Sequence, residues 1–392
     1  MSEAVSLAEL IAVDHLLTEE EKLVAETVRR FVRERYLPRA AELFAKEQFP
    51  TDLIPEMAEM GLLGASLKGY GCAGMSPTAY GLALEELEYG DSGLRSFASV
   101  QGSLAMFPIH KFGSEAQKER WLPGMAKGEI IGCFGLTEPD AGSDPGSMKT
   151  RAKKDGKDWV LNGTKMWITS SPVAKVAVVW AKTREDDPKS IRGFLVERGM
   201  KGFETPTVHG KMSLRASPTG EIVLSDVRVP EENMLPNVEG LRGPLSCLTQ
   251  ARFGISFGAL GAARACFDSV LAYSKERIVF GKPIASKQLI QKKLSDMAIE
   301  IAKGKIMGVH FARLKEQRDL LPAQVSLCKK NNVGIALEIA RTARSILAGN
   351  GILLEYPVIR HMLNLESVYT YEGTDEVHTL ILGQSLTGVS AF

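Results

Sequence analysis

Apolar residues in the first third of the chain recur at helical spacing. Thr18 begins the capping-box sequence Thr-Glu-Glu-Glu, and apolar positions then repeat every three or four residues until Pro38. Further helices are expected over about 53–63 and 78–89, with a glycine-rich loop between them, and Ser114 begins another capping box. This part of the chain therefore predicts a helical domain.

The pattern changes near residue 132, where apolar residues begin to alternate or to form short runs. The segments 159–161 and 164–169 flank Asn162-Gly163, a dipeptide typical of a two-residue hairpin turn. Further short strands are expected at 176–180, 193–196 and 222–224. These features predict a compact antiparallel β domain.

Helical periodicity returns after Pro244. Long helices are expected at about 245–275, 285–317 and 322–347, with a last one near 375–387. Their lengths suit a four-helix bundle with a broad apolar face. The predicted fold class is α+β, with an N-terminal α-helical domain over 1–131, a middle β domain over 132–240 and a C-terminal α-helical bundle over 241–392.

Composition narrows the class of protein. The 392 residues contain 48 Lys and Arg against 47 Asp and Glu, which disfavours nucleic acid or an anionic membrane as a partner held by bulk charge. We see no apolar run near the ~18–20 residues of a membrane span.

The histidines and cysteines bear on metal binding and redox state. The six histidines show no spacing typical of metal ligands, so no metal is expected. The five cysteines form no CxxC motif and are therefore expected to be reduced thiols in the core. The first residues resemble neither a secretory signal nor a transit peptide. We therefore expect a cytoplasmic location, or the mitochondrial matrix if the source is eukaryotic and the chain is processed.

Five segments carry candidate chemistry. They begin at Phe134 (FGLTEPDAGSD), Met166 (MWIT), Arg277 (RIVFG), Gly349 (GNG) and Tyr371 (YEGT). Backbone N–H groups and small hydroxyls in the first can hold polar ligand edges, an indole packs well on a flat cofactor, and a guanidinium suits a pyrophosphate. Taken singly, each segment is more typical of a turn, a core aromatic residue or a surface charge.

In this order, and over essentially the whole chain, the five segments resemble the acyl-CoA dehydrogenase family, most closely its glutaryl-CoA subgroup. The resemblance implies a flavoenzyme, usually a homotetramer, that oxidises a CoA thioester between its α and β carbons and passes electrons to an electron-transfer flavoprotein. It implies FAD contacts from Phe134, Leu136, Thr137, Gly142, Ser143, Trp167, Ile168, Thr169, Arg277, Phe280, Gln288, Ser345, Gly349 and Thr374. Strand alternation would put Trp167 and Thr169 on one face. The resemblance also implies that some of the FAD contacts, including the contacts made by residues 345–349, come from a neighbouring subunit.

Glu372, in a short loop between two helices, is the expected catalytic base. In an apolar slot roofed by the flavin its carboxylate would be desolvated, which raises its pKa toward a useful range. The thioester carbonyl would be polarised by the Glu372 backbone N–H and the flavin ribitol, so that Glu372 can remove the α proton while the β hydride goes to the flavin.

Arg95 is the expected anchor for the distal carboxylate of a glutaryl chain, with Ser96 and Ser99 nearby. Burying an arginine costs free energy unless the side chain pairs with an anion, but the spacing alone equally allows a surface arginine paired with Glu88 or Asp91.

The resemblance also implies a second reaction step. The oxidised product would lose CO2, and Glu372 would protonate the resulting dienolate to give crotonyl-CoA. Glu88 and Tyr371 would order the hydrogen bonds around that step. The other expected substrate contacts are Ser143, Arg252 and Gly373.

Two departures from the subgroup leave the acyl preference open. Leu94 stands where the subgroup usually has Tyr, and Asp375-Glu376 replaces the usual His-Asp. The alternatives are a relative with another acyl specificity, a non-decarboxylating glutaryl-CoA dehydrogenase, an oxidase that reduces oxygen, and a thioester-binding protein without catalysis.

Overall fold

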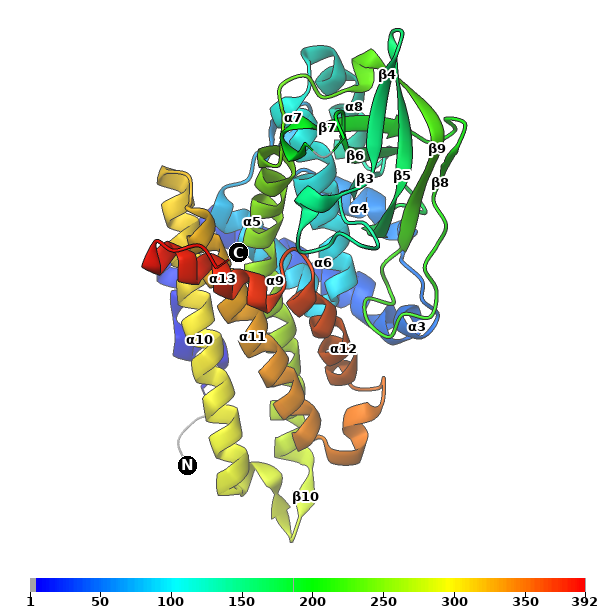
Figure 1. Cartoon of the computed structure of the whole chain (residues 1–392). Coiled ribbons are helices and arrows are strands. Elements are labelled where there is room, and N and C mark those ends of the chain that lie inside the picture. The colour runs from blue at the N-terminus through cyan, green and yellow to red at the C-terminus, as the bar shows by residue number, and fades with distance from the viewer. Residues whose placement is uncertain (1–4, 186, 392) are drawn as a thin grey trace.

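The chain folds into a group of helices, a β-sheet and a second group of helices (Figure 1). The computed structural model describes residues 5–185 and 187–391. The α–β–α order expected from the hydrophobic pattern is confirmed. In Figure 1 the sheet lies at one end of the long C-terminal helices, and the N-terminal helices pack beside both.

The N-terminal part is helical, as expected. The capping boxes at Thr18 and Ser114 are both formed. The helix expected over 53–63 ends earlier, because Gly61 and Gly64 take left-handed backbone angles of 70° and 75°. The helices are α1 (Leu7–Ile11), α2 (Glu19–Phe31), α3 (Ala40–Ala45), α4 (Ile54–Glu59), α5 (Pro77–Gly90), α6 (Ser92–Ser99), α7 (Phe107–Phe112) and α8 (Glu115–Ala126), and the glycine-rich loop forms a small hairpin of β1 (Lys68–Gly69) and β2 (Cys72–Ala73).

The middle sheet is mixed, which corrects the expectation of a purely antiparallel domain. Its strands are β3 (Gly132–Gly135), β4 (Arg151–Asp155), β5 (Asp158–Thr169), β6 (Val176–Lys182), β7 (Ile191–Glu197), β8 (Phe203–Glu204) and β9 (Thr219–Pro230). The order is β3-β6-β4-β5-β9-β8, with β7 beside β6. β3 runs parallel to β6 because β4 and β5 lie between them in the chain and form the long crossover that a parallel pair needs.

The hairpin expected at Asn162-Gly163 is wrong, because β5 runs straight through it. The strand pairs with β4 on one side and β9 on the other, and its register with β9 shifts between Leu161 and Gly163. The Asn162 side-chain amide donates to Asp226 Oδ1 over 2.9 Å, and its oxygen accepts from the Asp226 N–H over 3.0 Å. Asn162-Gly163 thus marks a β-bulge.

A second register shift in β5 lies between Lys165 and Ile168 and contains Trp167, whose φ is 62°. The simple alternation used to place Trp167 and Thr169 on one face is therefore interrupted.

The C-terminal part contains α9 (Arg242–Glu276), α10 (Gln288–Gln317), α11 (Pro322–Ile346), α12 (Pro357–Thr370) and α13 (Asp375–Thr387). A hairpin of β10 (Ile278–Val279) and β11 (Lys282–Pro283) joins α9 to α10. The long-helix expectations are confirmed, but α12 was not predicted. Its buried face includes the polar residues Arg360, His361 and Asn364. Because polar residues occupy these buried positions, apolar residues do not recur there at helical spacing. α13 runs across the bundle (Figure 1).

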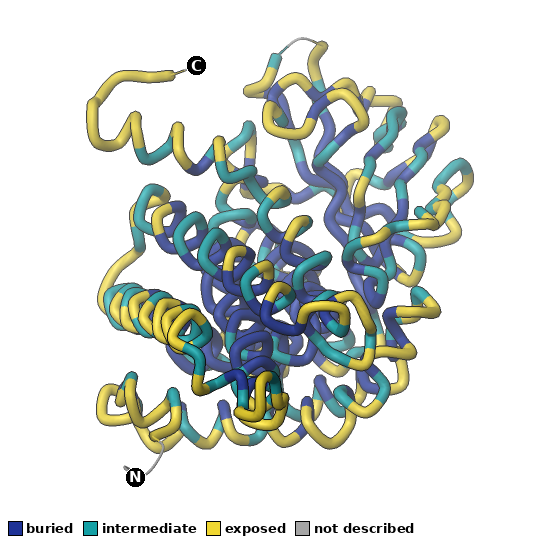
Figure 2. Tube along the Cα trace, turned by 90° about the horizontal axis from the view of Figure 1, so that it is seen from below, coloured by how far each residue is buried: buried dark blue, intermediate teal, exposed yellow. Residues whose placement is uncertain are grey.

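α9 is buried over much of its length, including an unbroken run over 251–263. Figure 2 shows the buried parts of the chain gathered in the middle of the molecule and the exposed parts around its rim. α9 was not predicted to be long and apolar enough to cross a membrane, but by length and composition it is. Within the fold, 72% of its most apolar window is buried. At Gly258 an added Cβ would lie 2.1 Å from Glu88 Oε2, and at Gly261 it would lie 1.9 Å from the Glu85 carbonyl oxygen. The two glycines therefore let α5 pack closely on α9.

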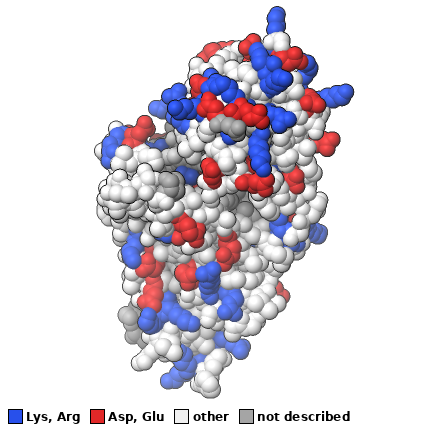
Figure 3. Space-filling view, viewed as in Figure 1, with Lys and Arg blue, Asp and Glu red and all other residues white. Residues whose placement is uncertain are grey.

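The surface carries charges of both signs. Figure 3 shows Lys, Arg, Asp and Glu side chains interspersed on one face, most densely over the sheet. This mixture agrees with a formal net charge of +1.

Candidate active site

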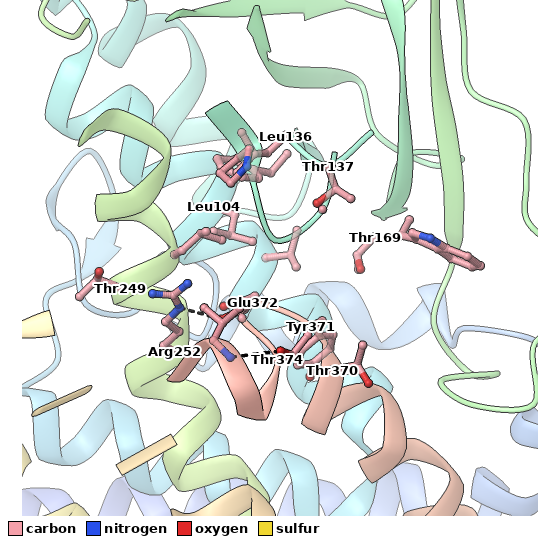
Figure 4. A pocket seen from close by; sticks show the side chains of 18 of the residues that line it. Leu104, Leu136, Thr137, Thr169, Thr249, Arg252, Thr370, Tyr371, Glu372 and Thr374 are labelled. Carbon is pink, nitrogen blue, oxygen red and sulfur yellow. Dashed lines mark hydrogen bonds between the residues drawn. The ribbon is translucent and has the colours of Figure 1, made fainter. Parts of the chain in front are cut away.

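A cavity of about 1340 Å³ lies where the sheet meets the C-terminal helices. Its wall combines the end of β3, the end of β5, the first half of α9 and the loop between α12 and α13. Figure 4 shows Thr249 and Arg252 on one side, Thr169 on the other, and Glu372 and Tyr371 between them. Pockets for one small molecule usually measure about 300–1,000 Å³, so this cavity has room for a flat cofactor and a substrate together.

Most of the sequence-predicted site residues line this cavity. They are Arg95, Ser96, Phe134, Leu136, Thr137, Gly142, Ser143, Trp167, Ile168, Thr169, Arg252, Tyr371, Glu372, Gly373 and Thr374. Glu88 and Ser99 lie behind the wall and are fully buried. The structure thus brings the expected acid–base, anchoring and cofactor groups of one chain to one place.

A second group of expected cofactor contacts is not brought to the cavity. The wall formed by residues 5–185 and 187–391 does not include Arg277, Phe280, Gln288, Ser345 or Gly349. These residues lie around the β10–β11 hairpin and the end of α11, at the far end of the long helices (Figure 1). Phe280 there is 92% exposed.

Glu372 occupies a backbone conformation that is unusual for its residue type, with a φ of 51°. Its Oε2 atom is buried and has no hydrogen-bond partner among the described residues. Burial raises the pKa of the Glu372 carboxyl to about 7, against the opposing effect of Arg95, Arg252 and Lys329. A carboxyl with a pKa near neutrality is suited to accept and return a proton.

The loop that carries Glu372 is fixed through its backbone. Arg252 Nε donates to the Glu372 carbonyl over 2.6 Å, and Lys329 Nζ donates to the carbonyls of Tyr371 and Gly373 over 3.2 and 2.8 Å. Gly373 has a φ of 96°, and a Cβ there would lie 2.9 Å from His378 Nε2. Glycine is therefore required at position 373.

Arg95 already has an anionic partner within the chain. Its Nε donates to Glu88 Oε2 over 2.6 Å, and the two side chains are 1% and 0% exposed. Its Nη2 donates to the Tyr371 hydroxyl, which lies 3.3 Å from Ser96 Oγ. Burial lowers the pKa of Arg95, but Glu88 and Tyr371 more than offset this and raise it. Of the two partners that spacing suggested, the structure therefore selects Glu88, and the pair is buried.

The polar segment after β3 is held by a buried ion pair that the sequence pattern did not predict. Lys165 Nζ lies 2.8 Å from Glu138 Oε1 and donates to the Leu136 carbonyl over 3.0 Å. Glu138 also accepts from the backbone N–H groups of Lys149 and Thr150. Burial lowers the pKa of Lys165 to about 8. The pair fixes the wall at 136–137. Glu138 lies inside the FGLTEPDAGSD segment, but nothing in the sequence marked Lys165 as its partner.

Other wall residues went unpredicted. They include Val100, Leu104, Lys111, Lys211, Ser213, Thr219, Phe253, Lys315 and Thr370. They come from helices and loops far apart in the sequence, so no local pattern marks them. Thr249, in contrast, lies in the stretch 245–252 in which the resemblance implied contacts with the CoA tail. Separately, no group of three or more His, Cys, Asp or Glu side chains in the described part of the chain could hold a metal ion.

Fold and site together define a member of the acyl-CoA dehydrogenase family, and the chain belongs to it. The family's N-terminal, middle and C-terminal domain models match residues 18–129, 133–227 and 239–387. The short-chain specific acyl-CoA dehydrogenase of Rattus norvegicus mitochondria is 36% identical over 374 residues, which cover 94% of this chain and 90% of that protein.

Two solved structures have a higher sequence identity to this chain than the Rattus norvegicus protein has. A glutaryl-CoA dehydrogenase from Mycobacterium smegmatis is 55% identical, with a TM-score of 0.97 over 99% of this chain and 100% of that one. A second structure of a glutaryl-CoA dehydrogenase from that organism, in complex with FADH2, is 52% identical, with the same TM-score and coverage.

Proposed function

We propose that this protein is an FAD-dependent glutaryl-CoA dehydrogenase that converts glutaryl-CoA to crotonyl-CoA and CO2. The observation that carries the proposal is the joint placement of Glu372 and Arg95 in the wall of one cavity. Glu372 supplies a carboxyl group whose Oε2 atom has no hydrogen-bond partner among the described residues. Arg95 supplies a cation that is held in place by Glu88 and Tyr371. The 55% identity to a glutaryl-CoA dehydrogenase supports the substrate.

The residues around the cavity fit FAD. The indole of Trp167 offers an aromatic face, and the hydroxyls of Thr137, Thr169 and Thr374 offer hydrogen bonds to the polar edge of a flat ring. The buried Lys165–Glu138 pair keeps the β3 side of this wall rigid. When bound, FAD would take up the two electrons released at the β carbon of the substrate.

The chain's own residues would move the protons. The Glu372 carboxylate takes the α proton, which the Glu372 backbone N–H makes more acidic by hydrogen-bonding the thioester carbonyl. The oxidised chain then loses CO2, because the electrons of the breaking C–C bond flow into the conjugated enone. The protonated Glu372 returns its proton to the γ carbon, which gives crotonyl-CoA and restores the carboxylate.

The distal carboxylate would bind beside the Arg95–Glu88 pair. Because Glu88 balances the charge of Arg95, the substrate carboxylate also needs neutral donors, and Ser96 Oγ lines the same wall. Burial raises the pKa of Tyr371 to about 12, so its hydroxyl stays protonated and can donate while it accepts from Arg95.

An assembly of several copies would complete the cofactor site. Arg277, Phe280, Gln288, Ser345 and Gly349 lie away from the cavity of their own chain. A neighbouring copy in a homotetramer would bring such residues to it. An electron-transfer flavoprotein as acceptor and a cytoplasmic location complete the proposal, and both rest on the family resemblance and the sequence.

A second candidate is a short-chain acyl-CoA dehydrogenase without decarboxylation. The internal neutralisation of Arg95 by Glu88 favours it, because an uncharged acyl end would then meet no unpaired cation. The Rattus norvegicus relative carries a short-chain name.

The deciding experiment measures CO2 release from glutaryl-CoA labelled at its distal carboxyl carbon, with an artificial electron acceptor, beside turnover of butyryl-CoA. Crotonyl-CoA with matching CO2 is the expected result. Glutaconyl-CoA without CO2, or turnover of butyryl-CoA alone, would overturn the assignment. Hydrogen peroxide in equal amount to product, in air and without acceptor, would instead identify an oxidase.

A further inference from the structure

Three consecutive backbone carbonyls around Glu372 are bound by two buried cations. Lys329, on α11, is 1% exposed, and its Nζ lies 3.2 Å from the Tyr371 oxygen and 2.8 Å from the Gly373 oxygen. Arg252, on α9, binds the Glu372 oxygen between them. The cavity wall formed by the described residues includes Arg252 but not Lys329. Lys329 therefore reaches the loop from behind.

The hydrogen bonds of Lys329 determine which way the backbone of the loop faces. In a trans peptide unit the C=O and the next N–H point in opposite directions. Binding of the Tyr371 carbonyl by Lys329 therefore turns the Glu372 N–H away from α11. This N–H has no hydrogen-bond acceptor among the described residues. It is thus left available on the cavity side of the loop.

The loop needs such support because its backbone is strained. Glu372 and Gly373 have φ values of 51° and 96°. A left-handed conformation at a non-glycine residue persists only where the surroundings hold it. Lys329 bridges the carbonyls on both sides of Glu372, and Arg252 binds the carbonyl between them, so Lys329 holds the two ends of the turn.

The charge of Lys329 also acts on the carboxyl of Glu372. The charged groups around it are Glu372 on the loop, Arg252 on α9, Asp375 on α13 and Arg95 on α6. His378, on α13, bonds Ser326 through Nδ1 and lies near the same cation. Burial lowers the pKa of Lys329 to about 7, and Glu372 opposes that shift. In return Lys329 favours the carboxylate form of Glu372.

We propose that Lys329 is a positioning residue of this enzyme, which aims the Glu372 backbone N–H into the cavity and keeps the Glu372 side chain ready to accept a proton. The inference rests on the proposed role of Glu372 as the base. It adds a residue that does not touch the substrate, acts through the Tyr371–Gly373 backbone, and lies on a helix that supplies no other part of the acid–base machinery.

Three substitutions separate the two parts of this role. Lys329→Met removes the hydrogen bonds and the charge, Lys329→Gln keeps a donor without the charge, and Lys329→Arg keeps both. Lys305→Met is the matched control, because Lys305 is a buried lysine on α10 that pairs with Glu85 away from the cavity. Each holoenzyme is assayed for kcat/KM from pH 5.5 to 9.5, for thermal midpoint, and for acetoacetyl-CoA affinity by flavin absorbance.

Loss of the cation should raise the pH at which Glu372 becomes a carboxylate. We expect the acid limb of kcat/KM to move up by about one pH unit in Lys329→Met and Lys329→Gln, so that activity at pH 6 falls about tenfold more than at pH 9. Lys329→Met should also bind acetoacetyl-CoA about tenfold more weakly, since the oxyanion donor is no longer aimed. Lys329→Arg should restore both properties in large part.

A purely structural role predicts a different pattern. Lys329→Met would then lower the thermal midpoint as Lys305→Met does, with a pH profile and an acetoacetyl-CoA affinity like those of the wild type, and this result would overturn the inference. Glu372→Gln distinguishes this failure from failure of the proposed function. If Glu372→Gln still oxidises thioesters, the base assignment is wrong; if it is inactive and Lys329→Met keeps the wild-type profile, only the role of Lys329 is wrong.

Discussion

Glu88→Gln should leave Arg95, in the cavity wall, as a buried cation without its anionic partner behind the wall. Glu88 and Arg95 are 0% and 1% exposed and lie 2.6 Å apart, while Ser92 Oγ donates to the other Glu88 oxygen over 2.7 Å. Removing one member of a buried ion pair usually costs about 3–5 kcal/mol, because the remaining charge loses its partner. Gln preserves the size of the side chain, so the loss is electrostatic rather than a cavity.

This cost is large enough to measure by thermal unfolding. At about 2.1 cal/mol/K per residue, the unfolding entropy of 392 residues is about 0.8 kcal/mol/K, so the loss lowers the thermal midpoint by about 4–6 °C. A glutaryl chain would restore the missing anion. Glutaryl-CoA should therefore raise the midpoint of Glu88→Gln more than that of the wild type, and butyryl-CoA should raise both equally.

Glu86→Gln is the matched control for this measurement. Glu86 is also buried on α5, and it pairs with Arg29 and Arg264 instead of a cavity residue. It should lose similar stability without any recovery specific to glutaryl-CoA. Equal effects of glutaryl-CoA and butyryl-CoA on Glu88→Gln, or an unchanged midpoint, would refute the placement of the distal carboxylate beside Arg95.

Three further predictions concern the loop that carries the base. Glu372→Gln should lower kcat about 10²–10⁴-fold while the flavin content, read from absorbance, stays that of the wild type; a smaller loss would place the base elsewhere. In the wild type, kcat/KM should rise with pH through about 7 as the Glu372 carboxyl loses its proton, and a flat profile from pH 5.5 to 8 would contradict this. Gly373→Ala forces a Cβ to within 2.9 Å of His378 Nε2 at a φ of 96°, so the thermal midpoint and kcat should both fall. Gly383→Ala, on α13 with open space around it, should be neutral or stabilising, and equal losses in the two alanine variants would argue against strain at 373.

Local signals in the sequence predicted local structure well. The capping boxes at Thr18 and Ser114 are visible because the residues that bond each other lie three positions apart. The same reasoning failed at Asn162-Gly163, whose conformation is set by Asp226 and Thr150, contacts that no nearby position encodes. It also missed α12, where buried polar side chains replace the apolar stripe.

In the candidate site, too, residues within continuous segments were predicted, and residues brought there by tertiary contacts were not. The resemblance of five segments located Glu372 and much of the cavity wall, because each segment is continuous in the chain. Lys329 and Lys165 escaped notice, since a single lysine in a helix or strand carries no sign that its ammonium meets carbonyl oxygens from another part of the fold. The partner of Arg95 stayed open because Glu88 and Arg95 lie on consecutive helices, whose relative orientation depends on packing against α9.

That packing depends on the bare backbone of α9 at Gly258. A methyl group there would lie 2.1 Å from Glu88 Oε2 and 3.1 Å from Arg95 Nε, so it would displace the buried ion pair. Gly258 is not among the described residues that line the cavity. If Arg95 binds the distal end of the acyl group as proposed, a substitution at 258 should change the acyl preference, and a mutational screen confined to cavity-lining residues would miss it.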